Sequence, residues 1–328
     1  MSAAPTMAGM VAMEISEQLR AAVTHVGAIG QRWLDELPAL VASLEADWGI
    51  TCGRALAGGH FAYVAEAVTA DGLPAVLKVA LPRSADGLKQ ELRALQVAQG
   101  DPYVRLIQHD EGRRSMLLEQ LGRPMGELGW PAARQISVIT STVARGWRPV
   151  DVDGLENGAT KAQWLAEFIA RTWRKLDQPC SEQSIERALD YAQERARLLA
   201  GQPTVLVHGD AHPWNVLEAR SDGSATGPGS SFRLIDPEGL ASEPAHELGV
   251  VLRGWNQELL ETDPAAVAFE RCESVGRQTG VDREAIWQWA YVERVSSGLF
   301  LLELGHRAEA QPYLEVADLL AAVAVPSP

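Results

Sequence analysis

The sequence predicts an α+β fold with two lobes, a small antiparallel β-sheet N-lobe and a mostly helical C-lobe. Between residues 49 and 81, short β-prone segments alternate with turn signals, and Asp71-Gly72 is a typical hairpin turn. From about Gly126 onward, apolar residues recur mainly at helical spacing. Within that helical part, two short apolar segments enclose a polar loop over residues 204–217, and we expect this loop to carry the chemistry.

The elements follow from the spacing of apolar residues and from the breakers between them. In residues 31–48, Leu34, Leu37 and Leu44 fall on one face of a helix. Residues 121–124 form a breaker cluster after the last predicted strand of the sheet. We expect further helices over residues 15–26, 88–98, 131–145, 161–176, 181–199 and within 264–322, and strands over 64–68, 75–79, 103–109, 115–120, 204–207 and 232–235.

The composition is that of a globular chain and restricts the possible partners. Hydrophobic residues make up 46% of the 328 residues, and the formal net charge is −14. The acidic excess argues against nucleic acid and anionic membranes, because binding phosphate groups requires Lys and Arg. Three distant cysteines in no metal-binding spacing favour a reducing compartment. With no signal-peptide pattern and no apolar run that spans a bilayer, we expect a cytoplasmic protein. We expect it to be a monomer or a dimer.

The polar loop carries the residues most specific for function. It begins with His208-Gly209-Asp210, Asn215 follows five residues after the aspartate, and the next strand ends at Asp236. Carboxylate and amide oxygens delivered to one edge suit Mg²⁺ that bridges phosphates. The order His-x-Asp-x-x-x-x-Asn, followed by Asp at a strand end, is the pattern of a kinase catalytic loop and its metal-binding aspartate. For each residue alone, a turn or capping role is the alternative.

A second indication is Lys78, a charged residue in an otherwise apolar predicted strand. An unpaired buried ammonium group is unfavourable, so this lysine requires a carboxylate or phosphate partner. Glu91 is the only acid in the predicted helix over residues 88–98, and we expect it to pair with Lys78 as in the Lys–Glu pair of kinases. The alternative is an edge-strand lysine that points to solvent.

Gly58-Gly59 links the first two predicted strands. Glycine allows backbone N–H groups to approach an anion, so this link is a candidate to cover nucleotide phosphates. A plain hairpin turn is the alternative.

The sequence resembles the aminoglycoside phosphotransferase family, and within it the streptomycin 6-phosphotransferase and hydroxyurea phosphotransferase branch. The matching segments lie between about residues 31 and 256, and besides the loop motif they are Arg32–Leu34, Leu37–Leu40, Ala75–Lys78, Val104–Leu106, His109-Asp110, Met116–Glu119 and Ile235–Glu238. The resemblance implies a bilobal protein-kinase-like fold. It also implies transfer of a phosphoryl group from ATP, with GTP as the alternative donor, to a hydroxyl of an antibiotic. The transfer would use Mg²⁺ and confer resistance by inactivation.

The resemblance implies three segments: residues 1–48 form an N-terminal helical segment, 49–121 the nucleotide-binding N-lobe, and 122–328 the C-lobe with the catalytic loop and acceptor site. Backbone groups around Glu119 and Leu121 would hold the adenine. In the loop, Asp210 would take the proton of the acceptor hydroxyl, and Asn215 and Asp236 would hold Mg²⁺. His212 either reaches the γ-phosphate or braces the loop.

The acceptor is expected to be a small, hydroxylated and cationic molecule, with streptomycin-like aminoglycosides favoured. Glu238, Glu243 and Glu247 are candidates to contact it. Acids at the start of a helix are also favourable for the helix dipole alone, so a structural role is equally open for Glu243 and Glu247. Two other readings remain: a kinase of the same fold that acts on hydroxyurea, another antibiotic or a metabolite, and a nucleotide-binding module without catalysis.

Overall fold

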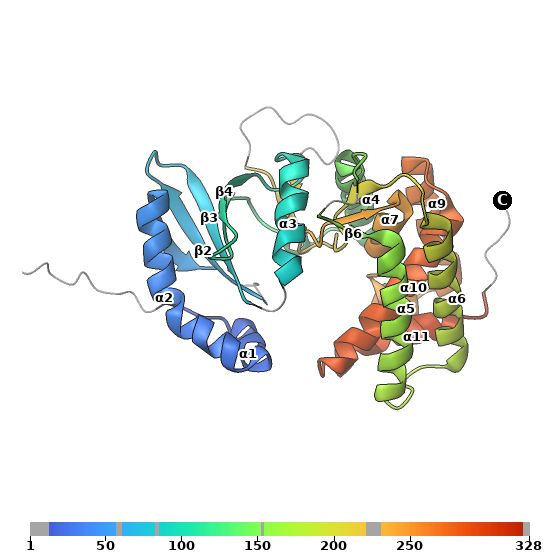
Figure 1. Cartoon of the computed structure of the whole chain (residues 1–328). Coiled ribbons are helices and arrows are strands. Elements are labelled where there is room, and N and C mark those ends of the chain that lie inside the picture. Colours follow the sequence, from blue (N-terminus) through green and yellow to red (C-terminus); the bar gives the residue numbers. More distant parts are fainter. Residues whose placement is uncertain (1–12, 57–60, 83–84, 152–153, 221–230, 324–328) are drawn as a thin grey trace, which may run out of the picture. The chain divides into compact units, whose positions relative to one another are not determined.

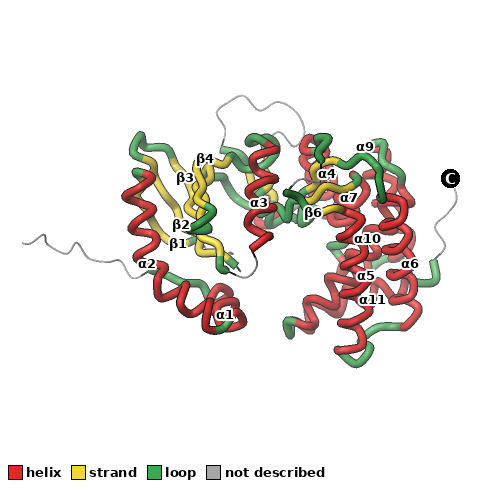
Figure 2. Tube along the Cα trace, viewed as in Figure 1, coloured by secondary structure: helices red, strands yellow, loops and turns green. Residues whose placement is uncertain are grey.

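The computed structural model describes residues 13–56, 61–82, 85–151, 154–220 and 231–323. It divides into two compact units, the first formed by residues 1–89 and 105–120 and the second by residues 90–104 and 121–328. Figure 1 labels their elements along the chain, and Figure 2 separates helices from strands. Helix α3 (Ala85–Ala98) begins in the first unit and ends in the second.

The first unit is built on an antiparallel sheet whose five strands lie in the order β1-β2-β3-β5-β4. The hairpin at Asp71-Gly72 is confirmed, since Gly72 has φ 84° and its N–H donates to the Thr69 carbonyl at 2.9 Å. The predicted small antiparallel sheet is therefore correct. Its strands are β1 (Ile50–Ala55), β2 (Ala62–Thr69), β3 (Pro74–Ala80), β4 (Leu106–Asp110) and β5 (Ser115–Glu119).

Helices α1 (Glu17–Val26) and α2 (Ala28–Trp48) belong to the same unit. The apolar face predicted for α2 packs on the core: Leu37 and Leu44 are fully covered and join a core that includes Leu77 of β3, and Leu34 is partly buried against it. At the surface, Arg113 donates to Asp110 at 2.7 Å and to Asp47 of α2 at 2.6 Å. The sheet and α2 thus share one core.

The second unit is mostly helical, as predicted, and is organised around α10 (Arg283–Glu303). This helix is buried along most of its length and contacts α5, α6, α7, α9 and α11. The predicted helical stretch from residue 264 is interrupted at Gly280, with φ 76°, and at Gly305, with φ 88°. The other helices are η1 (Met125–Leu128), α4 (Ala132–Gly146), α5 (Gly158–Lys175), α6 (Glu182–Leu199), α7 (Pro244–Leu252), α8 (Asn256–Leu260), α9 (Pro264–Thr279) and α11 (Arg307–Leu320).

Two small sheets hold the polar loop in this unit. Strand β8 (Val216–Glu218) pairs antiparallel with β9 (Phe232–Leu234), and the Ile235 N–H extends the ladder to the Asn215 carbonyl at 3.0 Å. This pairing places the start of β8 beside the end of β9, as the motif requires. The other sheet has the order β6-β10-β7, with β6 (Glu156–Asn157), β10 (Leu240–Ser242) and β7 (Val205–Val207).

Within the described ranges, no helix is both long and apolar enough to cross a bilayer.

Helices α7 and α10 approach so closely at Gly249 that a side chain does not fit. A Cβ added there would lie 2.4 Å from Cβ of Trp289 and 2.8 Å from the Ala290 backbone nitrogen. We expect Gly249→Ala to lower the free energy of unfolding by about 1–3 kcal/mol, because backbone atoms cannot yield without separating the helices. Denaturant unfolding measures this loss. Gly254→Ala is the control, since nothing lies within 4 Å of its added Cβ; equal losses in both variants would contradict the expectation.

Candidate functional site

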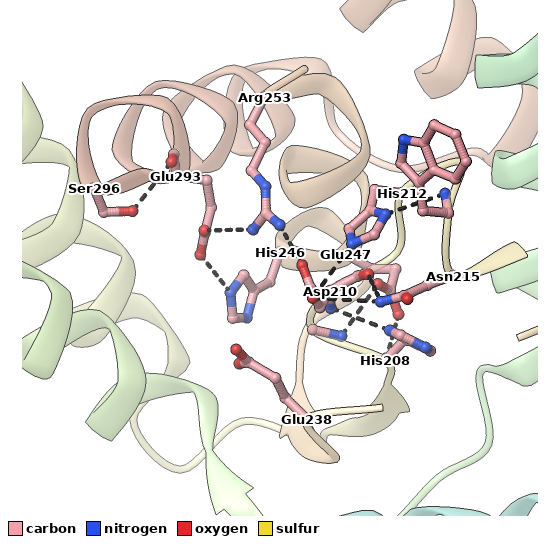
Figure 3. Close-up of polar contacts among 12 residues, drawn as sticks. His208, Asp210, His212, Asn215, Glu238, His246, Glu247, Arg253, Glu293 and Ser296 are labelled. Atoms are coloured by element: carbon pink, nitrogen blue, oxygen red, sulfur yellow. Dashed lines mark hydrogen bonds and ion pairs between the residues drawn. The ribbon is translucent and has the colours of Figure 1, made fainter. Parts of the chain in front are cut away.

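The polar loop between β7 and β8 brings Asp210 and Asn215 into direct contact. The Asn215 amide nitrogen donates to the Asp210 carbonyl at 3.0 Å and lies 3.4 Å from its carboxylate oxygen Oδ2 (Figure 3). The Asn215 N–H also donates to the His212 carbonyl at 2.9 Å. The amide nitrogen is used inside the loop, so the amide oxygen is the atom that remains for a ligand.

Gly209 occupies a position that only glycine fits. Its φ is +82°, and an added Cβ would lie 2.7 Å from Cδ1 of Leu240 and 3.1 Å from Cβ of Glu238. The loop therefore packs directly on the segment that follows Asp236, which explains the glycine between His208 and Asp210.

His208 supports the loop from behind as a neutral imidazole. Its Nδ1 accepts from the Asp210 N–H at 3.1 Å, so the proton is on Nε2, which donates to the Ile235 carbonyl at 2.7 Å. Burial lowers the pKa of His208 to about 4, although the nearby Asp210 acts in the opposite direction. The imidazole thus ties the loop to the end of β9.

Glu247 of α7 binds the backbone of the same loop. Its carboxylate accepts from the N–H groups of His208 and Gly209, at 2.5 and 3.4 Å. Burial raises the pKa of Glu247 to about 7, against the lowering effect of these two hydrogen bonds. Both carboxylate oxygens face the loop backbone, which gives this predicted substrate contact a bracing role in the structure.

Arg253 forms an ion pair with Asp210 through Nη2. Its Nη1 lies 3.3 Å from Glu293 of α10, whose other oxygen lies 3.2 Å from Nε2 of His246. Burial alone would raise the pKa of Asp210, but the Arg253 charge and the contact with His212 hold it well below its usual range. The carboxylate of Asp210 is therefore kept ionised.

His212 and Asp236 complete the loop region. Nε2 of His212 lies 3.5 Å from Oδ2 of Asp210, and its Nδ1 accepts from the Trp214 N–H at 3.2 Å. Asp236 has φ 57°, a left-handed conformation that is uncommon for residues other than glycine and is found often at functional sites. It follows β9 directly, at the strand end that pairs with the start of β8.

The other two predicted acceptor contacts already have cationic or indole partners. Glu238 lies 2.9 Å from the Lys161 ammonium group and is 45% exposed. Glu243 accepts from the Trp289 indole N–H at 2.7 Å, and the same oxygen lies 3.6 Å from buried Arg195. Of the three candidate acids, Glu238 is the one that is open to solvent and close to Gly209.

The predicted nucleotide contacts fall in both units. Lys78 is 8% exposed and lies in β3, between Val64 of β2 and Met116 of β5, so the edge-strand alternative is wrong. Glu91 is 9% exposed in α3, and its pairing with Lys78 stays a prediction. Glu119 ends β5 and accepts from the Arg105 N–H at 2.9 Å.

Three further predicted nucleotide contacts are Leu121, Gly58 and Gly59. Leu121 lies two residues after the end of β5 and is partly buried. Gly58 and Gly59 lie outside the described residues.

Across the described ranges, no three His, Cys, Asp or Glu side chains cluster closely enough to hold a metal by themselves. Mg²⁺ is commonly bound by one or two protein groups together with substrate phosphates, so Asn215 and Asp236 fit that mode and not an all-protein cage.

The sequence did not reveal Arg253, Glu293, His246 or Lys161 as a connected set. The available signal was local and weak: Arg253 is a charge that ends the apolar run Leu248–Leu252. Its partners lie 43 and 40 residues away in sequence, so only the fold brings them together.

We expect His208 to stay neutral down to a pH of about 4, as the Nε2–H tautomer. Its contribution to the free energy of unfolding is present above pH 6.5, the ordinary pKa, and is lost as the pH falls toward 4, because the unfolded chain then binds the proton. NMR of the imidazole nitrogens measures this, with His208→Gln to assign the signal. Protonation near pH 6.5 would contradict it.

The sequence is similar to those of known antibiotic resistance kinases. Residues 47–305 match the model of the aminoglycoside/hydroxyurea antibiotic resistance kinases. A streptomycin 6-kinase of Streptomyces glaucescens is 29% identical over 90% of this chain and 93% of that protein. A hydroxyurea phosphotransferase of Kitasatospora aureofaciens is 28% identical over 93% of this chain and 85% of that protein.

Among solved structures, the amicoumacin kinase hAmiN in complex with AMP-PNP, Ca²⁺ and Ami aligns with a TM-score of 0.54 at 13% identity, over 87% of this chain and 96% of that chain. This likeness confirms the predicted kinase-like fold. The family match covers most of the chain, and this chain therefore belongs to the aminoglycoside/hydroxyurea antibiotic resistance kinase family and is a phosphotransferase with a hydroxyl group as acceptor.

Proposed function

We propose that this chain transfers the γ-phosphoryl group of ATP to a hydroxyl of an aminoglycoside antibiotic, with a streptomycin-like acceptor favoured, and so inactivates it. The observation that carries the proposal is the loop in which Asn215 fixes Asp210 while Arg253 keeps its carboxylate ionised. The similarity to streptomycin 6-kinases supports the choice of acceptor.

In the proposed mechanism, Asp210 accepts a hydrogen bond from the acceptor hydroxyl and takes its proton late in the transfer. Phosphoryl transfer passes through a loose transition state, which needs positioning more than nucleophilic activation. A base with a low pKa suits such a late proton transfer. The hydrogen bonds of His208 and Glu247 to the loop backbone support a positioning role for Asp210. His212 either contacts the γ-phosphate or braces Asp210.

We assign the metal to Asn215 and Asp236. Mg²⁺ bound there with the nucleotide would neutralise phosphate charge. The orientation of the Asn215 amide, with its nitrogen turned to Asp210, supports this assignment. Lys78, paired with Glu91, is proposed to contact the α- and β-phosphates, Gly58-Gly59 to cover them, and Glu119 to Leu121 to hold the adenine. ATP is favoured over GTP on the resemblance alone.

One observation favours hydroxyurea as a second candidate for the acceptor. Glu238, Glu243 and Glu293 each have a cationic partner inside the protein, and Glu247 binds backbone N–H groups. A cationic aminoglycoside would have to compete with these partners, whereas a neutral acceptor would not. A cytoplasmic location and a monomeric or dimeric state stay predictions from the sequence.

Asp210→Asn is expected to lower kcat by roughly 10²–10⁴-fold, the range for loss of a general base, while Mg-ATP binding survives. ADP release and nucleotide titration measure the two quantities separately. Asp190→Asn, at an exposed position of α6, is the matched control and should keep full activity. Substantial turnover by Asp210→Asn would exclude the assignment of the base.

The acceptor is tested by ADP release with Mg-ATP across streptomycin, other aminoglycosides and hydroxyurea. We expect turnover on streptomycin, with loss on chelation of the divalent metal. Phosphorylation of hydroxyurea alone would replace the aminoglycoside by the second candidate. Mg-ATP binding without turnover on any of these acceptors would reject both and point to a different hydroxyl compound.

A further inference from the structure

Helices α8, α9, α10 and α11 enclose a small cavity in the helical unit, apart from the polar loop. Its volume is about 10 Å³, which is room for about one water-sized particle. Most of its wall is apolar, but two arginines line it, Arg271 of α9 and Arg294 of α10. The other lining residues are Leu252, Leu259, Ala268, Cys272, Trp287, Ala290, Tyr291 and Leu320.

Arg294 is a buried charge without a counter-charge among the residues that the structure describes. Its side chain is 3% exposed, Nε donates to the Asn256 side chain at 2.7 Å, and Nη2 donates to the Leu252 carbonyl at 2.9 Å. Both partners are neutral. Burial, together with the charge of Arg271, lowers the pKa of Arg294 to about 10, so the group is still charged at neutral pH.

Arg271 adds a second charge and an unused donor. Its Nη2 lies 2.6 Å from Glu258, which balances its charge, and its side chain is 10% exposed. Its Nη1, however, is buried with no hydrogen-bond partner in the described part of the chain. An unsatisfied buried donor on a charged group is costly.

Counting the groups at this cavity gives two guanidinium groups and one carboxylate, Glu258, and therefore one positive charge in excess. Arginine does not relieve such an excess by losing its proton at neutral pH. A single water would satisfy the Nη1 donor but leave the charge, whereas a monovalent anion satisfies both. The volume excludes phosphate or a nucleotide, so an anion bound there would have to be monatomic.

We propose that one halide ion, chloride in a physiological medium, binds in this cavity between Arg271 and Arg294 and stabilises the helical unit. The ion would join α9 to α10. Through Arg294 it would also support the turn after α7, because Arg294 holds the Leu252 carbonyl and Asn256, whose amide donates to the Arg253 carbonyl at 2.8 Å. This inference does not depend on the acceptor or on the phosphoryl transfer.

The test is thermal unfolding of the full chain while chloride replaces methanesulfonate at constant ionic strength. We expect a saturating rise in Tm of roughly 2–4 °C, since a ligand that binds only the folded state stabilises it. Arg271→Met removes the free donor and should abolish the rise. Arg277→Met is the matched control, because Arg277 lies on the same helix in an exposed pair with Glu273 at 2.8 Å, and it should keep the rise.

A second measurement covers the possibility that Arg271→Met does not fold. Crystals of the unsubstituted protein soaked in bromide should show an anomalous peak between Arg271 and Arg294. Absence of that peak, an equal rise in Tm for Arg271→Met, or no rise in the unsubstituted protein would each overturn the proposal and leave a water molecule in the cavity.

Discussion

The contact between Arg253 and Asp210 is the interaction on which the arrangement of the site depends. A carboxylate in a largely buried loop is unfavourable unless a charge of opposite sign meets it. Arg253 supplies that charge, and it is itself held by Glu293, which His246 contacts in turn. The ring of His246 stacks on Trp289, with centroids 3.9 Å apart, so the polar chain ends against an aromatic side chain of the core.

The polar groups around the loop have two structural roles. His208 and Glu247 hold its backbone, one through the imidazole and the other through a carboxylate that takes two N–H groups. Arg253 and Asn215 act on the Asp210 side chain and its carbonyl. Backbone and side chain are each held by one residue of the loop and one residue of α7 or its C-cap, which gives the aspartate a defined position before any ligand arrives.

Much of the fold could be predicted because its signals are local. The hairpin at Asp71-Gly72 and the apolar face of α2 are set by residues next to one another in sequence. The motif also predicted the proximity of Asp210 and Asn215, since their spacing of five residues fixes it within one loop. The partner of Glu238 could not be predicted in this way, because Lys161 lies 77 residues away on another element. In sequence Glu238 looks free to meet a substrate, whereas in the fold it is paired with Lys161.

The close approach at Gly249 has a consequence for how the chain tolerates change. Gly249 lies on α7 and Arg253 caps its C-terminus four residues later, and their respective contacts Trp289 and Glu293 are four residues apart on α10. The two contacts are therefore separated by one helical turn on each side. The distance between the helices that is set at Gly249 also sets the distance between Arg253 and Glu293. Selection for activity would then act on a residue with no functional group, and inactive variants are to be found among packing positions as well as among acids and bases.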